Sequence, residues 1–84
     1  MAYEIIWQPR ATNAAVRFLQ EDPQGLKAVY EAVDLLGENP RPRGSFVFGG
    51  TDIRRLHVGD YRILYVIEDA VVRILVTSLG RIPG

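Results

Sequence analysis

Residues 54–65 read RRLHVGDYRILY, two runs of β-forming residues separated by a Gly-Asp pair. Glycine at the first central position suits a type II′ turn, so this pair predicts a tight β-hairpin. In that hairpin His57 lies opposite Arg62, and Arg55 lies on the same face one row further from the turn. The stretch therefore predicts a sheet that gathers three cationic or titratable side chains on one face.

The same alternation continues to the end of the chain. We expect strands at residues 52–58, 61–68 and 71–79, with a second two-residue turn at Asp69-Ala70. With these pairings one face is almost wholly apolar and holds Leu56, Val58, Tyr61, Ile63, Tyr65, Ile67, Val72, Ile74 and Val76. The other face holds Arg55, His57, Arg62, Leu64, Val66, Arg73, Leu75 and Thr77. A one-residue slip would mix the two sets, so the sequence favours this register. If the alternation continues past Gly80, Arg81 lies near the second face.

The N-terminal half predicts a strand and a helical hairpin. Residues 3–7 (YEIIW) read as a strand, and Pro9 suits the first turn of a helix that runs to about Gln20. Asp22 and Pro23 mark a second helix start, and Gly37 ends that helix. Residues 38–51 read as a loop with a short strand at 45–48. The order β-α-α-β-β-β indicates one α+β domain over 1–84, a mainly antiparallel sheet with the hairpin on one face.

Composition limits the possible functions. The 84 residues, 48% of them hydrophobic, suffice for one modest core. The absence of cysteine excludes disulfides, and a single histidine argues against a zinc site. No apolar run reaches the roughly 20 residues of a membrane span, and the start MAYEIIWQ lacks the basic region of a signal peptide. We therefore expect a cytoplasmic domain with no cofactor, no metal and no membrane contact.

Charge is balanced overall but unevenly distributed. The net charge is zero, which argues against strong non-specific nucleic-acid binding. Residues 1–40 hold six acidic and three basic residues, whereas residues 41–67 hold five basic and two acidic ones. Nine of the ten basic residues are arginine, whose planar fork suits phosphate. Either the clustered arginines bind an anion, or they form a solvated strand face paired with Asp52, Asp60 or Glu68.

The second face also predicts a partner. Leu64, Val66 and Leu75 are expected beside the basic residues, and an apolar patch in that position indicates a surface that another molecule covers.

The stretch DIRRLHVGDYRILYVIEDAVVRILVTSLGR resembles the C-terminal half of the RelE/ParE superfamily of bacterial toxins. The shared pattern is a basic-Leu pair, a short turn ending in Tyr-Arg, a Leu-x-Tyr strand, an acidic turn, a β-rich strand and a closing Gly plus basic residue. YEIIWQPRA is similar to the family's usual opening, so the resemblance covers essentially the whole chain.

The resemblance to the RelE branch implies a metal-independent ribonuclease that cuts mRNA in the ribosomal A site and is held by an antitoxin in a hetero-oligomer. It implies that Arg62 binds the scissile phosphate, that Arg55 helps activate the 2′-hydroxyl, and that Arg81 aids the leaving oxygen. His57 is a further candidate for proton transfer, although the family does not require it. We expect Arg54, Arg73 and Thr77 to add substrate contacts, and Leu64, Val66 and Leu75 to bind the antitoxin.

The chain departs from the RelE pattern in two places. Active relatives carry a Tyr or His shortly after the last strand, where this chain reads RIPG, and Ile53 stands where some relatives have lysine. Two alternatives follow. The first is a ParE-like or degenerate toxin that acts by binding, through DNA gyrase inhibition or co-repression with its antitoxin. The second is a sheet domain without toxicity.

Overall fold

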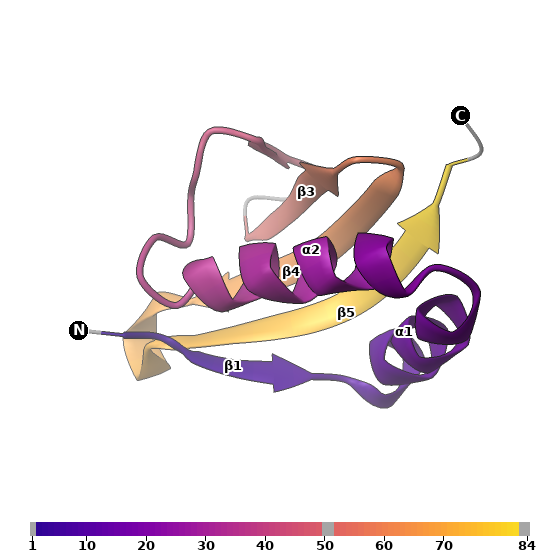
Figure 1. Cartoon of the computed structure of the whole chain (residues 1–84). Coiled ribbons are helices and arrows are strands. Elements are labelled where there is room, and N and C mark those ends of the chain that lie inside the picture. Colours follow the sequence, from indigo (N-terminus) through magenta and orange to yellow (C-terminus); the bar gives the residue numbers. More distant parts are fainter. Residues whose placement is uncertain (1, 50–51, 83–84) are drawn as a thin grey trace.

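The computed structural model describes residues 2–49 and 52–82, which form one five-stranded sheet and two helices. The elements are β1 (Glu4–Trp7), α1 (Pro9–Glu21), α2 (Pro23–Leu35), β2 (Ser45–Val47), β3 (Ile53–Val58), β4 (Tyr61–Glu68), a 3₁₀ turn (Asp69–Val71) and β5 (Arg73–Arg81). The strand order is β1-β5-β4-β3-β2, with β1 and β5 parallel and the other pairs antiparallel. Both helices cover the same face (Figure 1), which confirms the predicted α+β fold.

The helical hairpin forms where the sequence predicted it. Pro9 and Pro23 each occupy a first helical turn, where the missing N–H costs no hydrogen bond. Asp22 alone separates the helices, and its carboxylate accepts the Gly25 N–H at 3.1 Å. This cap satisfies one of the free donors at the start of α2 and fixes the break between the helices.

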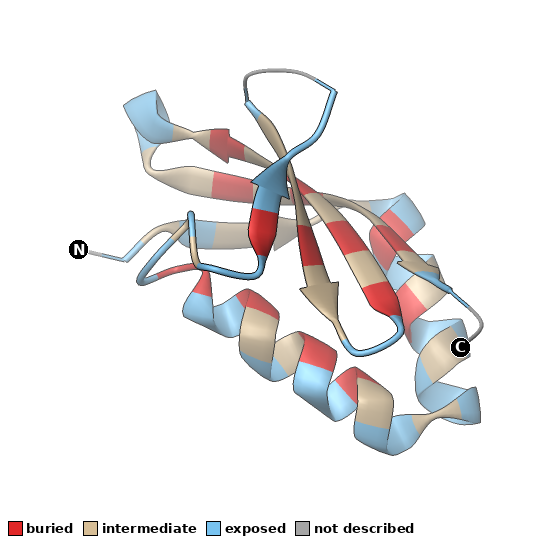
Figure 2. Cartoon of the chain, turned by 90° about the horizontal axis from the view of Figure 1, so that it is seen from above, coloured by how far each residue is buried: buried red, intermediate tan, exposed pale blue. Residues whose placement is uncertain are grey.

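The core lies between the helices and the sheet. Alternate residues of β4 are buried, which Figure 2 shows as regular bands along the strand. The buried apolar residues are Ala11, Ala15, Leu26, Val29, Val33, Leu36, Leu56, Tyr61, Ile63, Tyr65, Ile67, Ile74, Val76 and Leu79. Trp7 extends the core by packing against Tyr30 of α2, with ring centroids 5.4 Å apart. We call the opposite, helix-free side of the sheet the open face.

The first hairpin is confirmed residue by residue. His57 pairs with Arg62, Leu56 with Ile63, and Arg55 with Leu64. Gly59 has φ +56°, as the first central residue of a type II′ turn requires. Arg55, His57 and Arg62 therefore lie on the open face, as predicted.

The predicted second turn is wrong. In place of a two-residue turn at Asp69-Ala70, the chain forms the 3₁₀ turn and then Val72 in a left-handed conformation, with φ 53°. β5 consequently begins at Arg73, and Ile67 pairs with Ile74 in place of Val72. A shift of two residues preserves the alternation, so Ile74 and Val76 still face the core, whereas Val72 belongs to the turn.

A β-bulge then changes the second half of β5. Tyr65 pairs with Val76 and Leu64 with Ser78, which leaves Thr77 as an extra residue in the ladder. The Thr77 hydroxyl donates to the Leu64 carbonyl at 3.2 Å and partly replaces the lost ladder bond.

The bulge reverses the predicted position of Arg81. Beyond it Leu79 is buried, and Arg81 pairs with Tyr61, whose side chain faces the helices. The physical reason is the spacing of apolar residues in β5: Val76 and Leu79 are three positions apart, so one extra residue is needed to bury both. Arg81 is the last residue of the strand and lies on the helix side of the sheet.

Candidate functional site

The centre of the candidate site is a pair of neighbouring side chains on β3. Arg55 Nε donates to His57 Nε2 at 3.0 Å, so the imidazole is neutral and carries its proton on Nδ1. The pKa of His57 is lowered, first by burial and then by the charges of Arg62 and Arg55. His57 therefore stays neutral at physiological pH while two guanidinium groups stand beside it.

Arg62 completes the cluster from β4. Its Nη1 donates to the carbonyls of Gly59 and Tyr61, each at 2.9 Å, which holds the side chain over the hairpin turn. Within residues 2–49 and 52–82 neither Arg55 nor Arg62 forms an ion pair with a carboxylate. The described residues therefore do not form the alternative, a solvated strand face on which these arginines pair with carboxylates. We call Arg55, His57 and Arg62 the basic cluster.

Arg81 takes no part in this cluster. Its guanidinium lies 3.5 Å from Asp22, 4.0 Å from Glu21 and 5.4 Å from the ring centre of Tyr61. The Tyr61 hydroxyl donates to the same Asp22 carboxylate at 3.0 Å. The pKa of Asp22 is lowered by the Gly25 N–H, then by the Tyr61 hydroxyl and the charge of Arg81. Arg81 therefore ties the end of β5 to the helical hairpin, on the side of the sheet away from Arg62.

The other predicted substrate contacts are scattered. Arg54 lies on the helix side, where its guanidinium donates to the carbonyl and hydroxyl oxygens of Ser45 at 3.0–3.2 Å. Arg73 is at the far end of β5 and pairs with Glu68 at 2.7 Å. Thr77 lies in the bulge, and its hydroxyl is bonded to the backbone. The structure does not bring these three residues together with the basic cluster.

The apolar residues predicted to bind a partner do lie beside the cluster. Leu64 pairs with Arg55, and Val66 pairs with both Ile53 and Leu75 in the next row of the sheet. All are only partly buried because no helix covers this side. The basic cluster therefore borders a half-exposed apolar strip.

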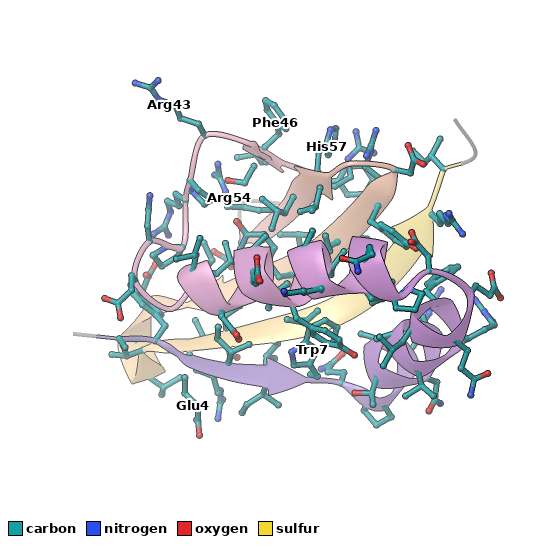
Figure 3. The ribbon with its side chains drawn as sticks, viewed as in Figure 1. Glu4, Trp7, Arg43, Phe46, Arg54 and His57 are labelled. Carbon is teal, nitrogen blue, oxygen red and sulfur yellow. The ribbon has the colours of Figure 1, made fainter. Side chains whose placement is uncertain are left out.

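Two functional candidates were missed in the sequence, because residues 38–51 read mainly as a loop. Phe46 pairs with Arg55 and is 57% exposed, and Phe48 just beyond β2 is 41% exposed. The alternation in Ser45-Phe46-Val47-Phe48 was the available signal, since it places both phenylalanines on one face. In Figure 3 Phe46 and His57 project side by side from the upper edge of the molecule.

A separate surface groove of about 610 Å³ lies between α1 and β5. Arg10, Asn13 and Arg17 line it from α1, and Ser78 and Leu79 line it from β5. It shares no residue with the basic cluster, and its arginines are exposed.

The described residues contain neither a candidate metal site nor a helix that could span a membrane. Residues 2–49 and 52–82 contain no group of three or more His, Cys, Asp or Glu side chains able to hold a metal ion. Neither helix in these ranges has the length and apolar character needed to cross a membrane.

A family model described as the ParE toxin of type II toxin–antitoxin systems, parDE, matches residues 5–80. The chain belongs to this toxin family. The match covers nearly the whole chain and confirms the RelE/ParE resemblance. A search of curated proteins gives no match for this ParE-family toxin.

Solved structures share the toxin's fold. The archaeal RelE–RelB complex from Pyrococcus horikoshii OT3 contains a similar chain with 26% identity, 96% coverage of each chain and a TM-score of 0.79. A free-state mutant of Escherichia coli RelE is 22% identical, with coverage of 96% of this chain and 84% of that one, and a TM-score of 0.81. The YoeB/ParE toxin from Agrobacterium tumefaciens is 12% identical, with coverage of 96% and 99% and a TM-score of 0.79. The shared fold extends across toxins named RelE, YoeB and ParE, so it does not choose between their activities.

Proposed function

We propose that this toxin inhibits translation by cutting mRNA on the ribosome in the cytoplasm, and that a cognate antitoxin silences it. The observation that carries the proposal is the basic cluster: Arg55, His57 and Arg62 adjoin on an open sheet face without a paired carboxylate among the described residues. Like charges held this close are costly, and a bound phosphate compensates for them.

Arg62 is the proposed ligand of the scissile phosphate. Its two intramolecular bonds use only Nη1, so the rest of the fork is available to non-bridging phosphate oxygens. The phosphorane-like transition state carries more negative charge than the ground state. A guanidinium fixed by two backbone carbonyls stabilises that extra charge without reorganising.

His57 and Arg55 are proposed to act as a coupled pair. Arg55 occupies the His57 Nε2 lone pair in the free protein, and an incoming phosphate draws the guanidinium away and frees that nitrogen. Nε2 then takes the proton of the RNA 2′-hydroxyl, and O2′ attacks the neighbouring phosphorus. The P–O5′ bond breaks to leave a 2′,3′-cyclic phosphate, and O5′ takes a proton from water to become a 5′-hydroxyl. The hydroxide left by that water takes the proton from His57 Nε2, which returns the imidazole to its neutral form.

The apolar strip is the proposed antitoxin surface. Leu64, Val66 and Leu75 adjoin the basic cluster, so an amphipathic or extended segment that carries acidic residues matches both parts. Relatives have been solved as RelE–RelB, RelBE and YoeB–YefM complexes. Such a segment blocks the cluster while it buries the strip.

The test is primer extension on translated mRNA after induction of the toxin. Arg62→Ala should lower cleavage by roughly 10²–10³-fold, the usual cost of one preorganised transition-state donor. Arg62→Lys should restore little, because a point charge does not replace a bidentate fork. Arg73→Ala is the matched control, since Arg73 lies on the same face but pairs with Glu68 far from the cluster. Equal cleavage by Arg62→Ala and the parent would contradict the proposal.

One observation favours a second candidate, a toxin that acts by binding alone. Arg81, which the RelE resemblance assigns to the leaving oxygen, is on the helix side with Asp22 and Glu21. A basic cluster without this arginine can still bind an anion, but it lacks the group that the resemblance assigns to the leaving oxygen. Inhibition of purified DNA gyrase, together with intact transcripts on ribosomes, would establish this candidate in place of the nuclease.

A further inference from the structure

The edge of the sheet next to the basic cluster exposes two aromatic rings. Phe46 in β2 and Phe48 just after it are 57% and 41% exposed, and neither belongs to the core. Exposing two large apolar rings close together is unfavourable in an isolated protein, so their exposure indicates a surface that binds another molecule.

Side chains of the basic cluster border both rings. The Arg55 guanidinium carbon stands 4.8 Å from the centre of the Phe48 ring, and the Phe46 and His57 rings are 5.4 Å apart at 59°. Arg55 and His57 are themselves bonded. The two phenylalanines and the basic cluster are thus one continuous surface that runs from β2 to β4.

We propose that Phe46 and Phe48 form a stacking platform for unpaired bases of the RNA whose phosphate the basic cluster holds. The proposal deepens the ribonuclease function and rests on it. Proteins commonly bind single-stranded RNA with aromatic rings beside guanidinium groups, because the bases stack on the rings while the cations bind the phosphate backbone.

The spacing of the surface suits one nucleotide and its neighbour. β2 and β4 are two strand spacings apart, about 10 Å, so a base on Phe46 and a phosphate at Arg62 are close enough to belong to neighbouring nucleotides. The guanidinium over the Phe48 ring favours this occupant over an apolar protein segment, which would have to desolvate that charge.

The experiment compares two probes in the same salt: a short fluorescein-labelled single-stranded RNA and an abasic oligomer of the same length. The double variant Phe46→Leu/Phe48→Leu keeps apolar side chains but removes both rings. It should bind the RNA roughly 10-fold or more weakly per lost base stack and bind the abasic oligomer as the parent does. Phe46→Tyr, which retains a π-face, should bind like the parent.

Val47→Ala is the matched control. Val47 is 62% exposed on the same strand but pairs with Arg54 on the helix side, so its loss should leave both affinities unchanged. All three substituted positions are exposed and lie outside the core, and thermal unfolding of each variant checks that the fold is retained.

Three outcomes would overturn the platform: unchanged RNA binding by the double variant, an equal loss for the abasic oligomer, or loss of antitoxin binding alone. The last would identify the rings as a protein contact. Cleavage on ribosomes is measured in parallel. If the parent does not cut mRNA but the double variant loses base-dependent binding, the result rejects the ribonuclease proposal and supports the stacking platform. If the parent cuts and the double variant binds both probes like the parent, only the platform fails.

Discussion

Tyr65→Phe tests how the loop before β2 is held. The Tyr65 ring is fully buried, and its hydroxyl donates to the Pro40 carbonyl at 2.7 Å, across 25 positions of sequence. The substitution keeps the ring and its packing, so no cavity term arises. It removes only this hydrogen bond between β4 and the loop.

The magnitude follows from the surroundings of the two partners. An intramolecular hydrogen bond contributes about 0.5–1.5 kcal/mol net, and an acceptor left without a partner in the interior costs more. Pro40 is only half-buried, so water can reach its carbonyl after the change. We therefore expect a loss of about 1 kcal/mol in the free energy of unfolding, which lowers Tm by about 4–8 °C in a domain of this size.

Urea unfolding at constant m-value measures the loss, and amide exchange of Arg41, Arg43, Gly44 and Ser45 should accelerate. Tyr30→Phe is the control, because no group in the described part of the chain accepts from that hydroxyl and the ring packs on Trp7. It should change stability by less than about 0.5 kcal/mol. Equal stability of the two variants would refute the view that Tyr65 anchors the loop.

Three further predictions concern titration and the first hairpin. By NMR, His57 should titrate below its ordinary pKa of 6.5, and Arg62→Ala should raise that pKa only in part, because burial is the larger cause. Because this pKa is lower in the folded state, the unfolded state binds the His57 proton more readily than the folded state does. Protonation of His57 should therefore reduce the free energy of unfolding as pH falls below 6.5. The lowered pKa of Asp22 contributes stability above pH 3.8 that is lost as pH falls through the lower folded value, so Asp22→Asn should flatten the acid limb of a pH–stability curve. Gly59→Ala should cost about 1–2 kcal/mol in thermal unfolding, because alanine disfavours φ +56°; a smaller cost than that of Gly80→Ala, which has no positive φ, would contradict the assigned turn.

The sequence was sufficient where short-range chemistry determines geometry. Gly59-Asp60 defines one turn type, and that turn sets the register of the whole first hairpin. Asp22 and Pro23 likewise mark the break between the helices. The positions of Arg55, His57 and Arg62 followed from these local signals.

The prediction failed where tertiary packing overrides local preference. Val72 is β-branched and disfavours a left-handed conformation, so no local signal marked the turn it completes. The bulge at Thr77 depends on burying Leu79 under the helices, which pairing by simple alternation does not consider. The position of Arg81 was wrong for that reason, and the roles of all site residues remain predictions.

The bulge has a consequence for how the toxin tolerates insertions and deletions. The ladder already skips Thr77, so deleting that residue would leave Leu79 opposite Ile63 and Arg81 opposite Tyr61. Deleting a neighbouring residue that has a ladder partner would instead force the ladder to re-form around the loss. Between relatives, a one-residue gap within the last strand is therefore expected at this position. Whether a C-terminal arginine in another toxin corresponds to Arg81 depends on whether that toxin also carries the extra residue.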